Sequence, residues 1–340
     1  PMICLCDLSS EVPVGRVLAP RRLNIRCKLK ANVKLYGEYS TEDTYSDDRE
    51  LEALTEETEV NRVCWGMGER LPLQDDLILS PADGEWRVVC AEGTVMITEA
   101  TPSMGQVNCR GEVTLKLTMC PAETEAEFAS DTADGRPSPA LTIMQRKIPF
   151  SHTVEVEGVT PTCTATACGY CTEISVEMEE GHVHVDMGVT VEARAQKKQR
   201  VSYVKDLFST RRESTCRYTA FPAESPLKAL NGNFTLSDSL PLSEVGIDPA
   251  ARVVDVTASA IPEGLTADPA KGRCLLTGKC RCHLLLLKEN EYATAELELP
   301  FRYEFDDLTL LRDAPTVKED THTSPAFDGS AEVVNCRARM

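Results

Sequence analysis

The sequence is poor in aromatic residues and has no long apolar run. Phe, Trp and Tyr make up 5% of the 340 residues, which argues against a surface that stacks bases or sugars. No run of 18 apolar residues occurs, so the sequence predicts no membrane insertion. The first ten residues, PMICLCDLSS, lack a basic start and a long apolar core. They are therefore unlike an export signal.

Basic residues are outnumbered by acidic ones. The chain has 54 Asp and Glu against 36 Lys and Arg, a formal net charge of −18. Such a chain should repel nucleic-acid phosphates and anionic lipid headgroups. The one dense basic cluster, AQKKQR at residues 195–200, is predicted to be a solvated strand end or turn. Nucleic acid is therefore disfavoured as a partner.

The motifs of common catalytic sites are missing from the sequence. It contains no GxSxG elbow, HExxH, P-loop, GxGxxG or EF-hand loop. Acidic pairs such as Asp75–Asp76 have no fixed partner that would separate their pKa values, so we interpret them as surface carboxylates. His182 and His184, two residues apart, are interpreted as part of a half-exposed strand face. The sequence predicts a non-enzymatic protein without a cofactor.

Cysteine, by contrast, is abundant. The 15 cysteines are an odd number, so at least one has no partner within the chain. Many lie in strand-like positions, where a thiol packs as a small apolar residue and a reducing compartment would permit it to stay unpaired. A second hypothesis is that exposed cysteines cross-link neighbouring subunits. The candidates for such cross-links are Cys4, Cys6 and Cys336.

Two cysteine groups are weak candidates for a metal site. The stretch CTATACGYC contains Cys163, Cys168 and Cys171, and the stretch CRCH contains Cys280 and Cys282. The flanks of the first group are strand-like, so no helix N-terminus is expected to lower a thiol pKa. In CRCH, residues two apart share a strand face, so the thiols point together and His283 points away. No metal site is predicted, and a cysteine-based metal or redox protein remains the alternative from another class.

Apolar and polar residues alternate with a period of two along most of the chain. Examples are RVVCAEGTVMITEA, HTVEVEG and TAELELPFRYEF, separated by Gly, Pro, Asp and Asn turns. This pattern predicts an all-β fold of short antiparallel strands in sandwich-like units. Helical periodicity is weak and allows at most two short helices. The better candidate is residues 47–60, and the second is residues 202–213.

The chain contains an internal sequence repeat with two copies. In both copies the order is a strand pair, an LPL segment, an RVV strand, a strand with a glycine, and a Pro-Phe strand. The matched glycines, Gly111 and Gly278, are predicted to mark a bulge or a close approach of strands. Aligning them sets Cys109 against Leu276, and Cys274 against Val107. Both cysteines are therefore expected to be apolar core residues.

The repeat defines the expected domain organisation. The first copy carries an insertion of Ala, Asp, Glu, Gly and Pro that is predicted to be an exposed loop. The predicted parts are an N-terminal segment (1–20), a first repeat (21–180) with its insertion loop (120–139), a second repeat (181–310) and a C-terminal tail (311–340).

The residues of the first copy resemble a known domain. The RVV strand from Arg87, the following glycine strand, KIPFSHTVEVEG and a long alternating strand pair are similar to the SPOCS domain, which is repeated in proteins of spore-forming Clostridia and their relatives. The resemblance covers most of residues 15–310. It implies a role in spore-envelope morphogenesis and protein interaction, without catalysis. Some members bind the ATPase that polymerises on the forespore surface. Those members usually end in a LysM module, and nothing after Asp306 resembles one.

These observations favour a structural protein of the spore envelope. We expect it to self-assemble into a layer or filament through β-domain contacts, with intersubunit disulfides as a possible reinforcement. The alternative within the class is an adaptor for the spore-coat ATPase. The expected partners are copies of itself or spore-coat proteins. The expected location is the spore envelope or surface, or alternatively the mother-cell cytoplasm at the forespore.

Overall fold

The computed structural model is all-β throughout the residues it describes, which confirms the predicted fold class. The described residues are 2–10, 14–19, 22–37, 51–79, 86–121, 141–179, 181–209, 211, 213, 215, 217, 234–239, 246–268, 273–289 and 291–306. Nothing helical in these ranges has the length and apolarity that a bilayer crossing requires. The predicted tail (311–340) and most of the predicted insertion loop (120–139) lie outside the described residues, and the predicted domain boundaries stay predictions.

The prediction of short helices is wrong in both places that the structure describes. Residues 51–60 belong to strand β5 (Leu51–Met67), and residues 202–209 belong to strand β11 (His182–Ser209). The two strands pair with each other. Glu, Leu and Ala favour a helix locally, but long-range hydrogen bonding to a partner strand overrides that preference.

The basic cluster at residues 195–200 also differs from its prediction. It lies inside β11 and not at a strand end or turn, although residues 198–200 are solvent-exposed as expected. The strand continues through the cluster because β5 supplies hydrogen-bonding partners on its flank.

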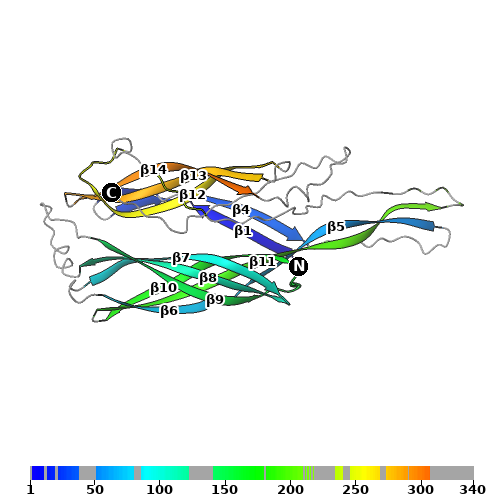
Figure 1. Cartoon of the computed structure of the whole chain (residues 1–340), viewed down its shortest axis with the longest axis horizontal. Helices are drawn as coiled ribbons and strands as arrows, with labels where there is room; N and C mark the ends of the chain where they lie inside the picture. The colour runs from blue at the N-terminus through cyan, green and yellow to red at the C-terminus, as the bar shows by residue number, and fades with distance from the viewer. Residues whose placement is uncertain are drawn as a thin grey trace. The chain divides into compact units, whose positions relative to one another are not determined.

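The chain divides into two compact units, and each is described by itself. Unit 1 contains residues 1–65 and 195–225, and unit 2 contains residues 66–194 and 226–340. In unit 1, β1 (Met2–Ser10) pairs antiparallel with β4 (Leu29–Gly37), and β2 (Val14–Ala19) pairs antiparallel with β3 (Arg22–Arg26). The part of β5 in this unit pairs with the distal part of β11, and we call this pair the ribbon (residues 51–65 and 195–209; Figure 1).

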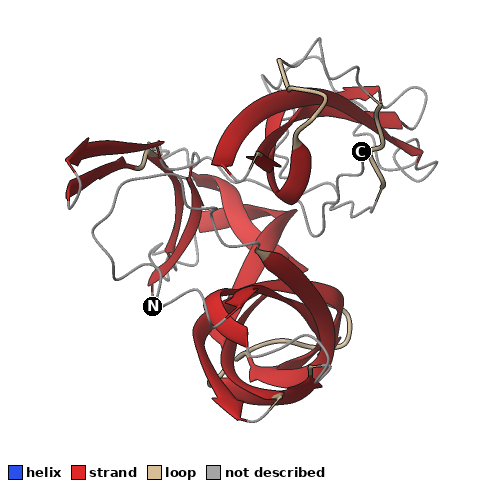
Figure 2. Cartoon of the chain, turned by 90° about the vertical axis from the view of Figure 1, so that its left-hand side faces the viewer, coloured by secondary structure: helices blue, strands red, loops and turns tan. Residues whose placement is uncertain are grey.

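The first part of unit 2 is built from two sheets around one interior. One sheet has the order β7-β8-β9, and in the other β11 pairs with β10 and with β6. In Figure 2 these strands curve around a common core at the bottom of the view. The bounds are β6 (Leu71–Ile78), β7 (Trp86–Ser103), β8 (Gln106–Pro121), β9 (Thr142–Glu155) and β10 (Thr164–Glu179).

The central strands of the two sheets supply most of this core. Alternate residues of β8 and β11 are fully buried, as the period of two requires. The fully buried members are Val107, Cys109, Val113, Leu115 and Leu117 on β8, and Val183, Val185, Val189, Val191 and Ala193 on β11.

The second part of unit 2 contains a three-stranded sheet, β12-β13-β14, that repeats β7-β8-β9. Its strands are β12 (Arg252–Asp268), β13 (Arg273–Lys288) and β14 (Glu291–Asp306). In the first sheet, β7 has irregularities at Val88/Cys90 and Ile97/Glu99, opposite Met119 and Gly111.

In the second sheet, β12 has irregularities at Val253/Asp255 and Pro262/Gly264, opposite Leu286 and Gly278. The spacing of the two bulges is the same in both sheets. The bulged strands therefore bend at equivalent places.

The matched glycines occupy the same environment in the two sheets, which confirms the predicted close approach. A Cβ at Gly111 would lie 2.4 Å from the Met96 carbonyl oxygen and 2.9 Å from the Phe150 ring. A Cβ at Gly278 would lie 2.4 Å from the Ile261 carbonyl oxygen and 2.7 Å from the Phe301 ring. Each glycine pairs with the Phe of the Pro-Phe strand. The PF motif therefore places a ring over a position that has no room for a side chain.

The repeat alignment also predicts core residues correctly. Cys109 and Val107 are completely buried, and their counterparts Leu276 and Cys274 are 6% and 8% exposed. A further cluster at one end of the second sheet joins Ile247, Ala251, Leu284 and Leu286.

Candidate functional site

The first group of candidate thiols lies in and beside strand β10. Cys163 precedes the strand, is buried, and accepts from the Thr160 amide across 3.4 Å. Cys168 lies on β10 with its sulfur 3.1 Å from the Tyr170 hydroxyl oxygen. Cys171 packs over Gly93 of β7, where a Cβ would come within 2.8 Å of the sulfur. The three residues therefore have packing roles in the structure.

Burial makes Cys171 of this group, and Cys109 of β8, poor nucleophiles. It raises the pKa of Cys171 above the ordinary value of 9.0, against a smaller lowering effect of the backbone hydrogen bond to Glu173. Burial, with a smaller contribution from nearby Cys168, raises the pKa of Cys109 to about 11. The thiolate is the reactive and metal-binding form, so both effects oppose redox chemistry at neutral pH.

The second group lies on strand β13 and has the predicted geometry. The sulfurs of Cys280 and Cys282 lie 3.9 Å apart on the inner face. His283 points to the other face, where its Nδ1 lies 3.3 Å from a Glu296 carboxylate oxygen. Among the described residues, no three or more His, Cys, Asp or Glu side chains form a group able to hold a metal ion.

The cysteines proposed for cross-linking are only partly described. Cys4 and Cys6 lie on β1, opposite Leu35 and Val33 of β4, and their side chains are outside the description. Cys336 lies outside the described residues altogether. Among the eleven cysteines whose side chains are described, no two lie at disulfide distance. Of these, Cys27 and Cys90 are exposed.

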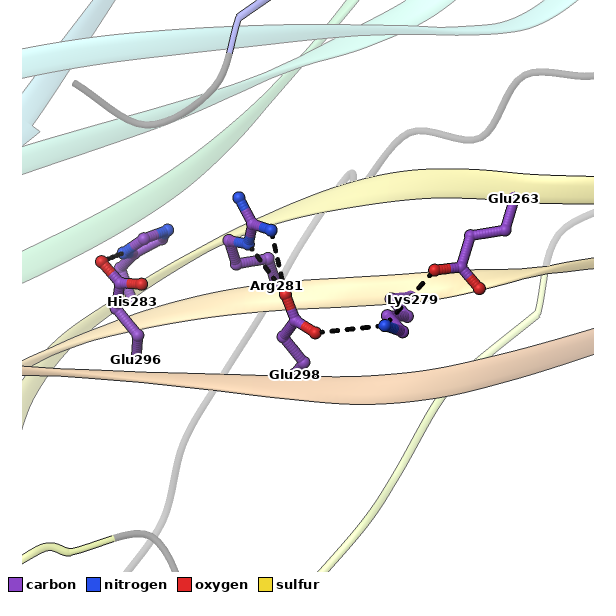
Figure 3. A network of polar contacts seen from close by, with 6 residues as sticks. All are labelled: Glu263, Lys279, Arg281, His283, Glu296 and Glu298. Atoms are coloured by element: carbon purple, nitrogen blue, oxygen red, sulfur yellow. Dashed lines mark hydrogen bonds and ion pairs between the residues drawn. The ribbon is translucent and has the colours of Figure 1, made fainter. Parts of the chain in front are cut away.

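The outer face of the second sheet carries a charged ladder, of which His283 alone is a residue named in the predictions from sequence. Lys279 of β13 bridges Glu263 of β12 and Glu298 of β14, with both nitrogen–oxygen distances at 3.4 Å. Arg281 donates two hydrogen bonds to Glu298, at 3.2 and 2.9 Å. The ladder thus joins all three strands (Figure 3). Its members are Glu263, Lys279, Arg281, His283, Glu296 and Glu298.

These contacts favour the charged forms of Lys279 and Glu298. The hydrogen bond to Glu263, then the charges of Glu263 and Glu298, raise the pKa of Lys279. The hydrogen bond from Arg281, together with Lys279, lowers the pKa of Glu298. The side chains of Glu263, Lys279, Glu296 and Glu298 are exposed, whereas His283 is only 16% exposed, so the carboxylates form the solvated part of the ladder.

The first sheet has the same cross-strand pair with the charges exchanged. Glu112 of β8 bonds to Lys147 of β9. Alignment on the glycines and on the Pro-Phe motifs places Glu112 at the position of Lys279, and Lys147 at the position of Glu298. The two copies therefore share a scaffold but present opposite charges at this pair of positions.

A histidine–carboxylate group lies on the other sheet of the first part of unit 2. His184 of β11 has its Nδ1 2.5 Å from an Asp76 oxygen on β6, and its Nε2 3.4 Å from an Asp186 oxygen. The hydrogen bond to Asp76, then the charges of Asp76, Asp186 and Glu177, raise the pKa of His184 above 6.5. The pair links neighbouring strands, whereas His182 is simply exposed.

Comparison with known proteins identifies the first sheet and its neighbours. Residues 87–187 match the family model described as SipL, SPOCS domain. The match runs from the start of β7 to the first residues of β11, and so includes Gly111, the Pro-Phe motif and the thiols of β10. Neither the curated proteins nor the solved structures give a match. The chain therefore carries a SPOCS domain at residues 87–187.

Proposed function

We propose that the chain is a non-enzymatic interaction protein of the spore envelope. The observation that carries the proposal is the SPOCS domain at residues 87–187, whose family is associated with sporulation and protein interaction. The second sheet supports it, since it repeats the bulges and the glycine–phenylalanine contact of that domain. Repetition of one scaffold with different surface charges suits a protein that makes several protein contacts.

More specifically, we propose that the protein self-assembles into a layer or filament. β-domains in series offer sheet faces and strand edges through which copies can associate. Disulfides between subunits would reinforce such an assembly, and the exposed thiol of Cys90 is available for one. The proposed location is the spore envelope or surface.

Two alternatives remain within reach of experiment. An adaptor for the spore-coat ATPase would use the same SPOCS surface without polymerising. A cysteine-based metal or redox protein would use Cys280 and Cys282, whose sulfurs lie 3.9 Å apart. The raised pKa values of Cys109 and Cys171 give that second alternative no support.

The test combines production and assembly. In a spore-forming host, the tagged protein should be made only during sporulation and should fractionate with the spore envelope. The purified protein, imaged by negative-stain electron microscopy in reducing and oxidising buffers, should form regular assemblies that resist dilution better when oxidised. Production in vegetative cells alone would contradict the spore role. If the protein is made only during sporulation but stays monomeric in both buffers, self-assembly is contradicted and the adaptor alternative is favoured.

A further inference from the structure

The ribbon has two strand edges with which no described strand pairs. Tyr203 donates to Glu56 across 3.0 Å, and Arg200 lies 3.5 Å from Glu59, which fixes the register of β11 against β5. Among the described strands, β5 pairs only with β11. The other edge of β5 therefore has no partner among the described strands along the ribbon.

The second open edge belongs to β11. On that flank its neighbour is β10, where Thr172 donates to the Gly188 carbonyl across 3.1 Å. Strand β10 begins at Thr164, eight residues before Thr172, so in an antiparallel pair its start lies near residue 196. From about residue 197 to 203, no described strand covers this edge. Exposed edges of this kind are templates for pairing with another chain.

The two edges carry opposite charges. Along β5 the ribbon has an acidic run with a single basic residue, and along β11 it has a basic run with a single acidic residue. The acidic run is Glu52, Glu56, Glu57 and Glu59, and the basic run is Lys197, Lys198, Arg200 and Lys205. A chain with net charge −18 thus concentrates basic residues on one strand edge.

Some of these charged residues form ion pairs within the ribbon, and we call those with no ion pair in the described part of the chain the leftover charges. Glu56 pairs with Lys205 at 2.8 Å, and Glu59 with Arg200 at 3.5 Å. In the described part of the chain, no ion pair involves Glu52, Glu57, Lys197 or Lys198.

The leftover charges are distributed over both ribbon faces. By the period of two and the register above, Glu52 and Lys197 share one face, and Glu57 and Lys198 share the other. Each face therefore has one unused acid on the β5 edge and one unused base on the β11 edge.

We propose that the β5 edge of one copy pairs with the β11 edge of a second copy. The inference rests on the proposed self-assembly and names the contact. The leftover acids of the β5 edge and the leftover bases of the β11 edge have opposite signs, so attraction between the two edges favours this junction. Pairing of like edges sets acid against acid or base against base. The contact is heterologous, and such contacts propagate into an open filament unless a ring closes.

The apolar residues of the ribbon favour the same partner. Leu54, Val201, Tyr203 and Phe208 are each more than one third exposed. A two-stranded ribbon is marginally stable in water by itself, and added strands would extend the sheet and give these side chains cross-strand neighbours.

The experiment uses charge reversal with complementation in the full-length protein. Variant A is Glu52→Lys/Glu57→Lys, and variant B is Lys197→Glu/Lys198→Glu. Each has like-charged edges, so each should self-associate about tenfold more weakly than the wild type. In a 1:1 mixture, both junctions between A and B are again complementary. Sedimentation velocity at low and high salt should show association in the wild type and in the mixture, weakened by salt.

The matched control is Glu69→Lys/Glu157→Lys, which makes the same charge change at exposed positions outside the ribbon. It should associate like the wild type. Loss of association in A and B with no recovery in the mixture would overturn the charge-complementary junction, as would a control that behaves like A. If the wild type assembles and none of the reversals matters, the ribbon proposal fails while the proposed self-assembly stands. Recovery in the mixture also shows that the variants fold.

Discussion

The two three-stranded sheets of unit 2 have the same bulges and the same glycine–phenylalanine contact, but they differ in core and surface side chains. Both place bulges at the same spacing, and both put a glycine under a phenylalanine ring from the Pro-Phe strand. The core positions differ: Val113 and Leu115 of β8 correspond to Cys280 and Cys282 of β13. On the outer face, the Glu112–Lys147 pair corresponds to the reversed Lys279–Glu298 pair.

This difference separates what the fold requires from what the surface is free to vary. Register and bend depend on bulges and on a position without a side chain, so they recur. Cross-strand charges need only be opposite, so either orientation is tolerated. Residues that differ between the copies are therefore the place to look for separate binding roles.

The largest expected effect comes from emptying equivalent core positions. Leu117→Ala removes a completely buried side chain of β8, and Leu284→Ala removes its counterpart on β13, which is 6% exposed. Both should lower the free energy of unfolding by about 2–5 kcal/mol, with Leu117→Ala the more costly. Guanidinium denaturation followed by circular dichroism measures the change. If both substitutions lower the free energy of unfolding by the same small amount, neither side chain lies in a well-packed core.

Adding a methyl group to the matched glycines should cost somewhat less. Gly111→Ala and Gly278→Ala each push a Cβ to within 2.4 Å of a carbonyl oxygen, so the strands must separate. We expect a loss of about 1–3 kcal/mol at each site. Gly264→Ala is the control, because its nearest neighbour is the Thr277 hydroxyl at 3.2 Å. If the two glycines differ as much from each other as from the control, the sheets are not equivalent.

Reversing one charge in each sheet should have a smaller effect. Glu112→Lys places two lysines at diagonally adjacent positions of β8 and β9 and should cost about 1 kcal/mol, and the exchange Glu112→Lys/Lys147→Glu should recover most of it. Lys279→Glu should cost more than Glu112→Lys, because Lys279 bridges two carboxylates. Denaturation midpoints at low salt measure these changes, and high salt should shrink them. An exchange that recovers nothing would show that Glu112 and Lys147 do not interact.

The sequence predicts the scaffold well because its physical signals are local. Period-two alternation indicates strands wherever one face is buried. The repeated glycine and Pro-Phe motif predict the close approach at Gly111 and Gly278 from the sequence alone. The same strand geometry predicts correctly that Cys280 and Cys282 point together and that His283 points away.

The ribbon could not be predicted in the same way. Residues 51–60 have the Glu, Leu and Ala content of a helix, and only pairing with β11 makes them a strand. The charge ladder is also invisible in sequence, because Lys279 meets Glu263 and Glu298 only when the registers of three strands are known. Likewise, the sequence does not show that the basic cluster AQKKQR lies in a ribbon with the acidic strand β5, because the pairing of β5 with β11 is needed for that.

The smallest expected effect is a pH dependence confined to the sheet that packs with β7-β8-β9. Asp76 and the charges of Asp186 and Glu177 raise the folded-state pKa of His184 above 6.5. The resulting stabilisation is fully present below the unfolded-state pKa, provided that the carboxylates are ionised, and is lost as pH rises through the raised folded-state pKa. His184→Gln should therefore lower the denaturation midpoint at about pH 6 and converge with the wild type at about pH 9. His182→Gln, an exposed neighbour on the same strand face, is the control. A His184→Gln deficit that stays constant across this range would assign the residue a packing role in place of an electrostatic link between β6 and β11.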